Sequence, residues 1–222
     1  MSDSSEGKKN WVPYVVPFIV FMALTEAGRY FPAHAHLLYI VKTITVGGLL
    51  WFWRHSYASD FTLKMRHGGL MTAVAAGLIV LAIWILPDKL FPQHGIDDVF
   101  NPFSFNIPQF AVYTVIAVRL FGAVIVVPVM EELFWRSFLL RYLVNPDFKK
   151  VSLGTFSWFS FIAVVILFGI EHHRLIQGMI AGIIYTALVI YQKNLAGCVL
   201  AHGVTNLGLG VYVISTQSWE FW

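Results

Sequence analysis

Residues 121–136 read FGAVIVVPVMEELFWR, an uncharged run followed by two glutamates and then an arginine. They lie within an apolar stretch, 110–143, that is longer than the roughly 20 residues needed to cross a membrane. Ionisable groups inside such a stretch are costly, and they usually mark a functional site or a buried pair. The segment therefore predicts a long membrane helix that carries polar chemistry along its length.

The composition of the whole chain agrees with a membrane protein. Of 222 residues, 58% are hydrophobic and only 12% are charged, against about 25% charged in soluble domains. No polar linker divides the chain, so we expect one integral membrane domain over residues 1–222. The expected fold class is all-α, a polytopic helical bundle of about seven transmembrane helices with the active site inside it. The predicted spans are 11–27, 36–53, 69–86, 110–143, 155–172, 175–192 and 195–215.

The loop charges predict an orientation. A cytoplasmic N-terminus places nine basic residues inside and three outside, the pattern typical of bilayer proteins. The inside set is Lys8, Lys9, Arg54, Lys64, Arg66, Arg141, Lys149, Lys150 and Lys193; the outside set is Arg29, Lys89 and Arg174. Met1 to Asn10 is interpreted as a short cytoplasmic tail, and Pro87 to Pro108 as an irregular or interfacial loop. Because the basic residues are scattered between apolar runs, nucleic-acid binding is not expected.

The pair Glu131–Glu132 can be resolved by helical geometry. Adjacent residues on a helix point about 100° apart, so the two carboxylates face different neighbours. Glu132 and Arg136 are four residues apart and can form a structural ion pair. This leaves Glu131 unpartnered in apolar surroundings, which suits a general base. The alternative is that both glutamates only mark a wet helix end.

Two further polar groups follow at the same spacing. Phe168 and His172 lie one helical turn apart at the end of an apolar run, although His172 by itself fits an interfacial histidine. His202 and Asn206 share one face well inside the last apolar segment, where they need polar partners or a wet cavity. A purely structural His–Asn hydrogen bond is the alternative for this pair.

Together the three helices offer the groups that a hydrolase needs. A carboxylate and an imidazole, Glu131 and His172, can hold and deprotonate a water molecule. His202 and Asn206 can stabilise the negative charge that develops on a substrate oxygen. Glycines next to the last pair are expected to let neighbouring helices approach closely. Cys198, the single cysteine, excludes an intrachain disulfide and is expected to be a buried, inert thiol.

The order of these groups resembles the CAAX-protease and bacteriocin-processing (CPBP, or Abi) family of intramembrane proteases. That family carries Glu-Glu-x-x-x-Arg, Phe-x-x-x-His and His-x-x-x-Asn or Asp on successive membrane helices. The matching residues here are Glu131, Glu132, Arg136, Phe168, His172, His202 and Asn206, with Gly178, Gly182, Tyr185 and Asn194-Leu195 also similar. The resemblance covers about residues 120–210, and the family-like catalytic core is expected within about 110–215.

The resemblance implies an endopeptidase that cleaves a membrane-associated or lipidated protein or peptide. Glu131 would be the catalytic glutamate, His172 would position the water, His202 and Asn206 would stabilise the oxyanion, and Phe168 would support the site. No cofactor is expected, with zinc on Glu131 and the two histidines as the alternative, since zinc accepts such ligands. No His-Glu-x-x-His motif is present. The motif Glu-Glu-Leu-Phe-Trp-Arg is similar to that of a bacterial subgroup of the family associated with exosortase systems. The bacterial inner membrane is therefore the expected location.

Two other functions fit the same polar residues. A transporter or proton relay also places carboxylates and histidines inside the membrane, but usually shows internal symmetry, which the sequence lacks. A non-catalytic membrane scaffold would not need all four polar residues. The protease interpretation raises a difficulty about the depth of these residues in the membrane. Straight spans put His172 near the outer side and His202 about 10 Å from the inner end of its helix. Convergence therefore requires tilted helices, short helices or span boundaries that differ by several residues from those expected.

Overall fold

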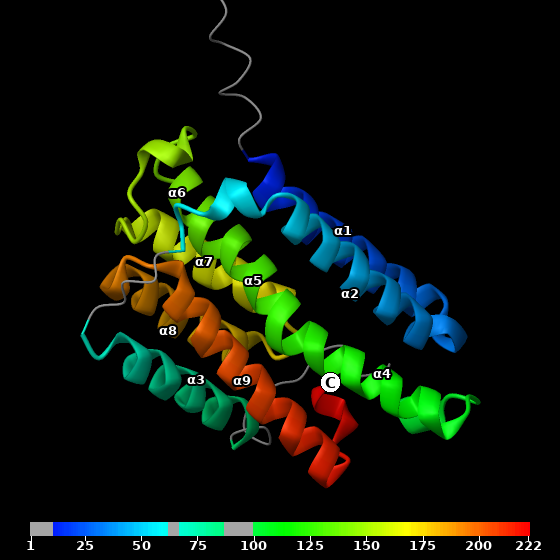
Figure 1. Cartoon of the computed structure of the whole chain (residues 1–222). Helices are drawn as coiled ribbons and strands as arrows, with labels where there is room; N and C mark the ends of the chain where they lie inside the picture. Colours follow the sequence, from blue (N-terminus) through cyan, green and yellow to red (C-terminus); the bar gives the residue numbers. More distant parts are fainter. Residues whose placement is uncertain (1–10, 62–66, 87–99) are drawn as a thin grey trace, which may run out of the picture.

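The computed structural model describes residues 11–61, 67–86 and 100–222, and every regular element among them is helical (Figure 1). The main helices are α1 (Val12–Tyr30), α2 (Ala35–Phe52), α3 (Gly69–Ile85), α4 (Gln109–Phe121), α5 (Val127–Glu132), α6 (Leu140–Tyr142), α7 (Trp158–Glu171), α8 (Leu175–Gln192) and α9 (Leu195–Thr216). The predicted all-α membrane bundle is confirmed, and every predicted span matches a helical segment within a few residues. The N-terminal tail and much of the 87–108 loop lie outside the described residues.

Two of the apolar helices, α3 and α7, are shorter than the others. Five helical segments are long and apolar enough to cross a membrane, and α3 and α7 are shorter. The 14 residues of α7 extend over about 21 Å at 1.5 Å per residue, less than the roughly 30 Å of a hydrocarbon core. The residue that follows α7 is His172. By itself, α7 is therefore too short to cross the hydrocarbon core.

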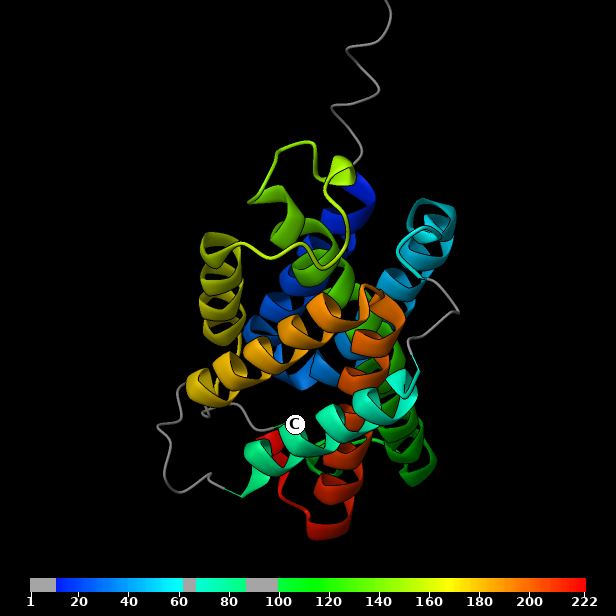
Figure 2. The same ribbon diagram turned by 90° about the vertical axis from the view of Figure 1, so that its left-hand side faces the viewer.

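One continuous helical segment, Gln109–Tyr142, runs through the middle of the bundle. It contains two stretches of wider π-helical turns, Gly122–Val126 before α5 and Leu133–Leu139 after it. In Figure 1 the α1–α2 pair lies on one side of this segment, and α3, α8 and α9 lie on the other. Figure 2 shows α8 crossing the bundle obliquely with α3 and α9 beside it. The central segment therefore contacts both halves of the molecule.

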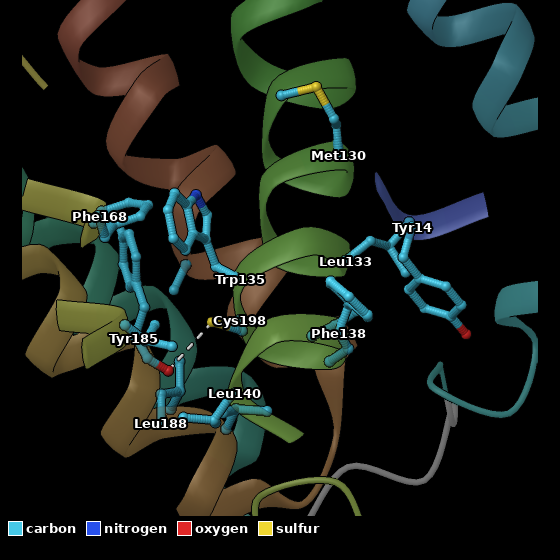
Figure 3. Close-up of a cluster of buried hydrophobic side chains, with 14 of the residues drawn as sticks. Tyr14, Met130, Leu133, Trp135, Phe138, Leu140, Phe168, Tyr185, Leu188 and Cys198 are labelled. Atoms are coloured by element: carbon cyan, nitrogen blue, oxygen red, sulfur yellow. Dashed lines mark hydrogen bonds between the residues drawn. The ribbon is translucent and has the colours of Figure 1, made fainter. Parts of the chain in front are cut away.

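The core is built around the same segment (Figure 3). On one side, Tyr14 of α1 faces Leu133 and Phe138. On the other side, the ring of Trp135 lies 5.9 Å from that of Phe168 in an edge-to-face arrangement. Cys198 is fully buried there, as expected, and its thiol donates to the Tyr185 carbonyl at 3.3 Å. Side chains on opposite faces of one helix thus join the two halves.

Glycines allow α9 to pack closely against its neighbours. A methyl group on Gly203 would lie 3.0 Å from the Val124 carbonyl oxygen, and one on Gly77 of α3 would overlap the carbonyl of Ala201. At Gly77 the helices are also joined by a hydrogen bond of 2.8 Å from the Thr205 hydroxyl to the Gly77 carbonyl. Both approaches are between backbones, which cannot move aside as a flexible side chain does.

We expect Gly77→Ala to destabilise the protein and lower its activity. The added methyl group must push α3 away from α9 beside His202, and overpacking of this kind costs about 1–3 kcal/mol. Gly48→Ala in α2 is the matched control because nothing lies near its new methyl group. The melting temperature in detergent checks this: Gly48→Ala should melt at the wild-type temperature or slightly above, and equal melting of the two variants would contradict the close packing.

Candidate active site

The four residues predicted to be catalytic line one small pocket. Glu131, His172, His202 and Asn206 all contribute to a cavity of about 110 Å³ between the central segment, α7 and α9. The other residues of its wall are Val80, Trp84, Val127, Phe168, Ala181, Tyr185, Thr205 and Leu209. The packing of the helices therefore places His172 and His202 in the wall of the same cavity, which resolves the difficulty of their depth.

Glu131 is held in α5 with one carboxylate oxygen free. The residue is 4% exposed, and its Oε2 atom has no hydrogen-bond partner among the described residues. A buried polar atom without a partner costs free energy unless a water or ligand satisfies it. Because this oxygen belongs to a residue of the pocket wall, a water molecule in the cavity would supply the missing hydrogen bond.

Pro128 explains both the π-helical turns before Glu131 and the position of Asn206. Proline has no amide hydrogen, so a carbonyl one turn earlier loses its helical donor. The Asn206 amide nitrogen donates to the Ala123 carbonyl at 2.7 Å, five residues before Pro128. π-Helical turns of this kind occur often at functional sites. One N–H of the Asn206 amide is thereby used by the backbone, and the second is left for the pocket.

His172 has a defined protonation pattern. Its Nδ1 atom lies 2.7 Å from the Phe168 carbonyl oxygen. A carbonyl can only accept a hydrogen bond, so Nδ1 carries the hydrogen and Nε2 of the neutral ring is left with a lone pair. Phe168 thus orients His172 through its backbone as well as through its ring, whose centroid lies 4.5 Å from that of the imidazole. The supporting role expected for Phe168 has this physical basis.

Glu132 and Arg136 form the expected ion pair, with 3.1 Å between Oε1 and Nη1 and no exposure of either side chain. Glu132 does more than pair with Arg136. Its Oε1 also accepts from His202 Nδ1 at 2.9 Å, and its Oε2 accepts from the Cys198 thiol at 3.0 Å. The Arg136 guanidinium lies 4.1 Å from the centre of the Phe168 ring, a cation–π contact. The pair therefore anchors His202 as well as the central segment.

The bond between Glu132 and His202 was not predicted. The two residues are 70 positions apart, and only the arrangement of the helices brings them together. The His202 ring also stacks on Tyr185 at 5.2 Å between centroids, with 22° between the planes. Both contacts fix the ring so that Nε2 is the nitrogen left for the cavity. The one available sequence signal was that a buried histidine in a membrane helix needs a polar partner.

A second, much larger cleft lies next to the pocket. It has a volume of about 1430 Å³, and its wall includes Trp135, Glu171 and His172. Glu171 accepts a hydrogen bond of 3.0 Å from the indole nitrogen of Trp135. His172 lines both cavities, so the cleft and the small pocket adjoin at this residue. Glu171 was not among the predicted site residues, although its position directly before His172 was a signal for it.

The fit of the site to zinc can be judged from its donor atoms. Within the described part of the chain, no three His, Cys, Asp or Glu side chains are grouped as metal ligands. His202 turns its Nδ1 toward Glu132, and His172 turns its Nδ1 toward a carbonyl. The arrangement as it stands offers a carboxylate and two ring nitrogens around a water-sized cavity, without the close cluster that zinc requires.

Comparison with known proteins finds one family model that matches part of the chain. Residues 106–208 match the family model described as Rce1-like: type II CAAX prenyl endopeptidase Rce1-like. The matched segment contains Glu131, Glu132, His172, His202 and Asn206. No curated protein and no solved structure matches the chain. The resemblance seen in the three motifs is confirmed over residues 106–208 of this integral membrane protein, which match the Rce1-like family of CAAX proteases.

Proposed function

We propose that this protein is a glutamate-dependent intramembrane endopeptidase that cleaves a membrane-associated or lipidated protein or peptide. One observation carries the proposal: the unpartnered carboxylate oxygen of buried Glu131 lies in the same pocket as His172, His202 and Asn206. Endopeptidase activity in general is supported by the match to this family. The assignment of roles to the four side chains is the part that needs experiment.

In the proposed reaction, a water molecule is held between Glu131 and His172. Glu131 takes a proton from the water as the oxygen attacks the scissile carbonyl, while the lone pair of His172 Nε2 accepts the second water hydrogen. The carbonyl oxygen becomes negatively charged as the new C–O bond forms. Glu131 then gives its proton to the departing amine as the C–N bond breaks, which returns the carboxylate to its starting state.

The negative charge on the substrate oxygen is met by two donors. The second N–H of the Asn206 amide is one of them, and Nε2 of His202 is the other. For Nε2 to donate, His202 must be protonated at both ring nitrogens, and the Glu132 carboxylate at 2.9 Å stabilises that imidazolium. The ion pair with Arg136 keeps Glu132 in place for this role.

The proposed location is the bacterial inner membrane with a cytoplasmic N-terminus. The excess of basic residues in the inside loops supports this orientation. Lys8, Lys9, Lys64 and Arg66, four of the nine residues counted, lie outside the described residues. With this topology α7 runs from the cytoplasmic side to its early end at His172.

The test is cleavage of a prenylated peptide with a C-terminal CAAX sequence by the purified protein in detergent, with products identified by mass spectrometry. We expect cleavage that persists after dialysis against a strong chelator, because the proposed base is Glu131 and no bound metal is used. Loss of cleavage on chelation, restored by added zinc, would replace this mechanism with the zinc alternative. Ion flux in vesicles without any cleavage would favour the transporter.

A further inference from the structure

The large cleft contains two cations whose charge nothing in the described structure balances. Its wall is mostly apolar and aromatic, with contributions from α1, α2, the end of α7 and the chain terminus. Lys42 of α2 and Arg119 of α4 are part of this wall. Both fall inside apolar stretches of the sequence, where a charge needs a partner or a polar cavity.

Lys42 is almost completely buried in an aromatic cage. The residue is 7% exposed, and its Nζ atom donates to the Thr25 hydroxyl at 2.9 Å. The same atom lies 4.2 Å from the centre of the Phe21 ring and 4.6 Å from that of Tyr39. A hydroxyl and two ring faces stabilise an ammonium group partly, and they leave two of its three hydrogens unassigned to an oxygen.

Arg119 faces the same Tyr39 ring. Its guanidinium carbon lies 4.6 Å from the centre of that ring, 4.0 Å from the Phe100 ring and 5.1 Å from the Trp222 ring. Its Nε atom is buried and has no hydrogen-bond partner among the described residues. Ring faces thus surround the guanidinium of a residue that lines the cleft, and its Nε–H lacks an acceptor among the described residues.

Three of the other arginines have a carboxylate partner. Arg136, Arg141 and Arg29 each form an ion pair with a carboxylate, whether the pair is buried or exposed. Among the residues that the structure describes, neither Lys42 nor Arg119 forms such a pair. Two like charges thus share an aromatic ring in the cleft, and neither has a carboxylate partner in the ranges that the structure describes.

We propose that Lys42 and Arg119 bind the C-terminal carboxylate of a peptide substrate in the large cleft. The inference rests on the proposed protease function, because the cleft and the pocket of Glu131 share His172 in their walls. A guanidinium pairs with a carboxylate through two parallel hydrogen bonds, and an ammonium adds a third donor. The apolar wall accepts the adjoining side chains. Fixing the chain end in this way sets which peptide bond reaches Glu131.

The binding experiment uses the Glu131→Gln variant, so that it does not depend on cleavage. Two fluorescent CAAX peptides of one sequence are compared, one with a free C-terminal carboxylate and one with a C-terminal amide. We expect the acid to bind at least tenfold more tightly, which is a conservative figure for charge-assisted hydrogen bonds. Adding Arg119→Met or Lys42→Met should remove most of this preference, and Arg119→Lys should retain part of it.

Arg29→Met is the matched control. Arg29 lines the same cleft but is exposed and paired with Glu26 at 3.1 Å, so the acid-to-amide ratio should stay at its starting value. Because the ratio is measured on folded protein of each variant, a general loss of stability does not imitate the effect. If the protein prefers the acid but the wild type cleaves no peptide, carboxylate binding by Lys42 and Arg119 would stand and the proposed protease function would be wrong.

Three results would overturn the proposal. Equal binding of acid and amide would show that the chain end is not recognised. Equal binding combined with competition by phosphatidylglycerol, and not by phosphatidylcholine, would assign the cations to a lipid headgroup. Equal binding combined with a lower melting temperature of Asp97→Asn or Asp98→Asn would identify a carboxylate of the chain itself as their partner; these two residues lie outside the described ranges.

Discussion

Glu131→Gln is expected to lower the cleavage rate by about 10²–10⁴-fold, the range that a positioned general base contributes. The change preserves the size and polarity of the side chain and removes the group that accepts the proton of water. Because Glu131 Oε2 has no partner among the described residues, no hydrogen bond of the fold is lost. The melting temperature in detergent and the affinity for the peptide should therefore stay close to those of the wild type.

Glu171→Gln provides the matched control for this result. Glu171 is a second carboxylate beside His172, and its bond is to the indole nitrogen of Trp135. The oxygen of a glutamine side chain can still accept that bond, so this variant should retain most of the activity. Cleavage by Glu131→Gln at the wild-type rate would show that another group activates the water. Equal loss in both variants would indicate that the two carboxylates act as one unit.

Local spacing was sufficient to predict much of the site. The ion pair of Glu132 with Arg136 and the contact of Phe168 with His172 each join residues four apart on one helix, and both are present. Such contacts follow from helical geometry alone. The spans were predictable for a similar reason, because apolar length determines which segments cross a bilayer.

Contacts between helices were not predictable in this way. The bond from His202 to Glu132 and the bond from Asn206 to Ala123 depend on how α9 lies against the central segment. A proline inside a helix indicates a kink in general, but the π-helical turns on both sides of α5 are seen only in the structure. The meeting of Lys42 and Arg119 likewise depends on tertiary packing, although each was visible as a charge inside an apolar stretch.

The bounds of a single helix, α7, affect whether the four candidate catalytic residues are expected to lie close together. Extending α7 over 155–172 gives it enough length to carry His172 toward the outer side. In the structure Ser157 is extended and the helix begins at Trp158. The helix also ends at Glu171, so it has 14 residues, four fewer than the expected span, and is shorter by about 6 Å at 1.5 Å per residue. Helix ends are the least certain part of a sequence prediction, and here they determine the depth of a catalytic side chain.

Arg136→Met is expected to produce the second large effect, on stability and activity together. The substitution leaves the Glu132 carboxylate fully buried with its main positive partner removed, and breaking a buried pair in this way costs about 3–5 kcal/mol. The exposed pair of Arg29 with Glu26 supplies the control, because Arg29→Met should cost less than about 1 kcal/mol. Melting temperatures in detergent compare the two.

The double variant Glu132→Gln with Arg136→Met separates the two effects. Neutralising both partners removes the uncompensated buried charge, so the melting temperature should recover most of what Arg136→Met lost. The glutamine oxygen can still accept the bond from His202 Nδ1, but a neutral amide no longer stabilises an imidazolium. The catalytic efficiency, kcat/KM, should therefore stay well below that of the wild type although the fold is restored. Full recovery of both quantities would mean that His202 needs only to be held in place, and that its charge has no part in the reaction.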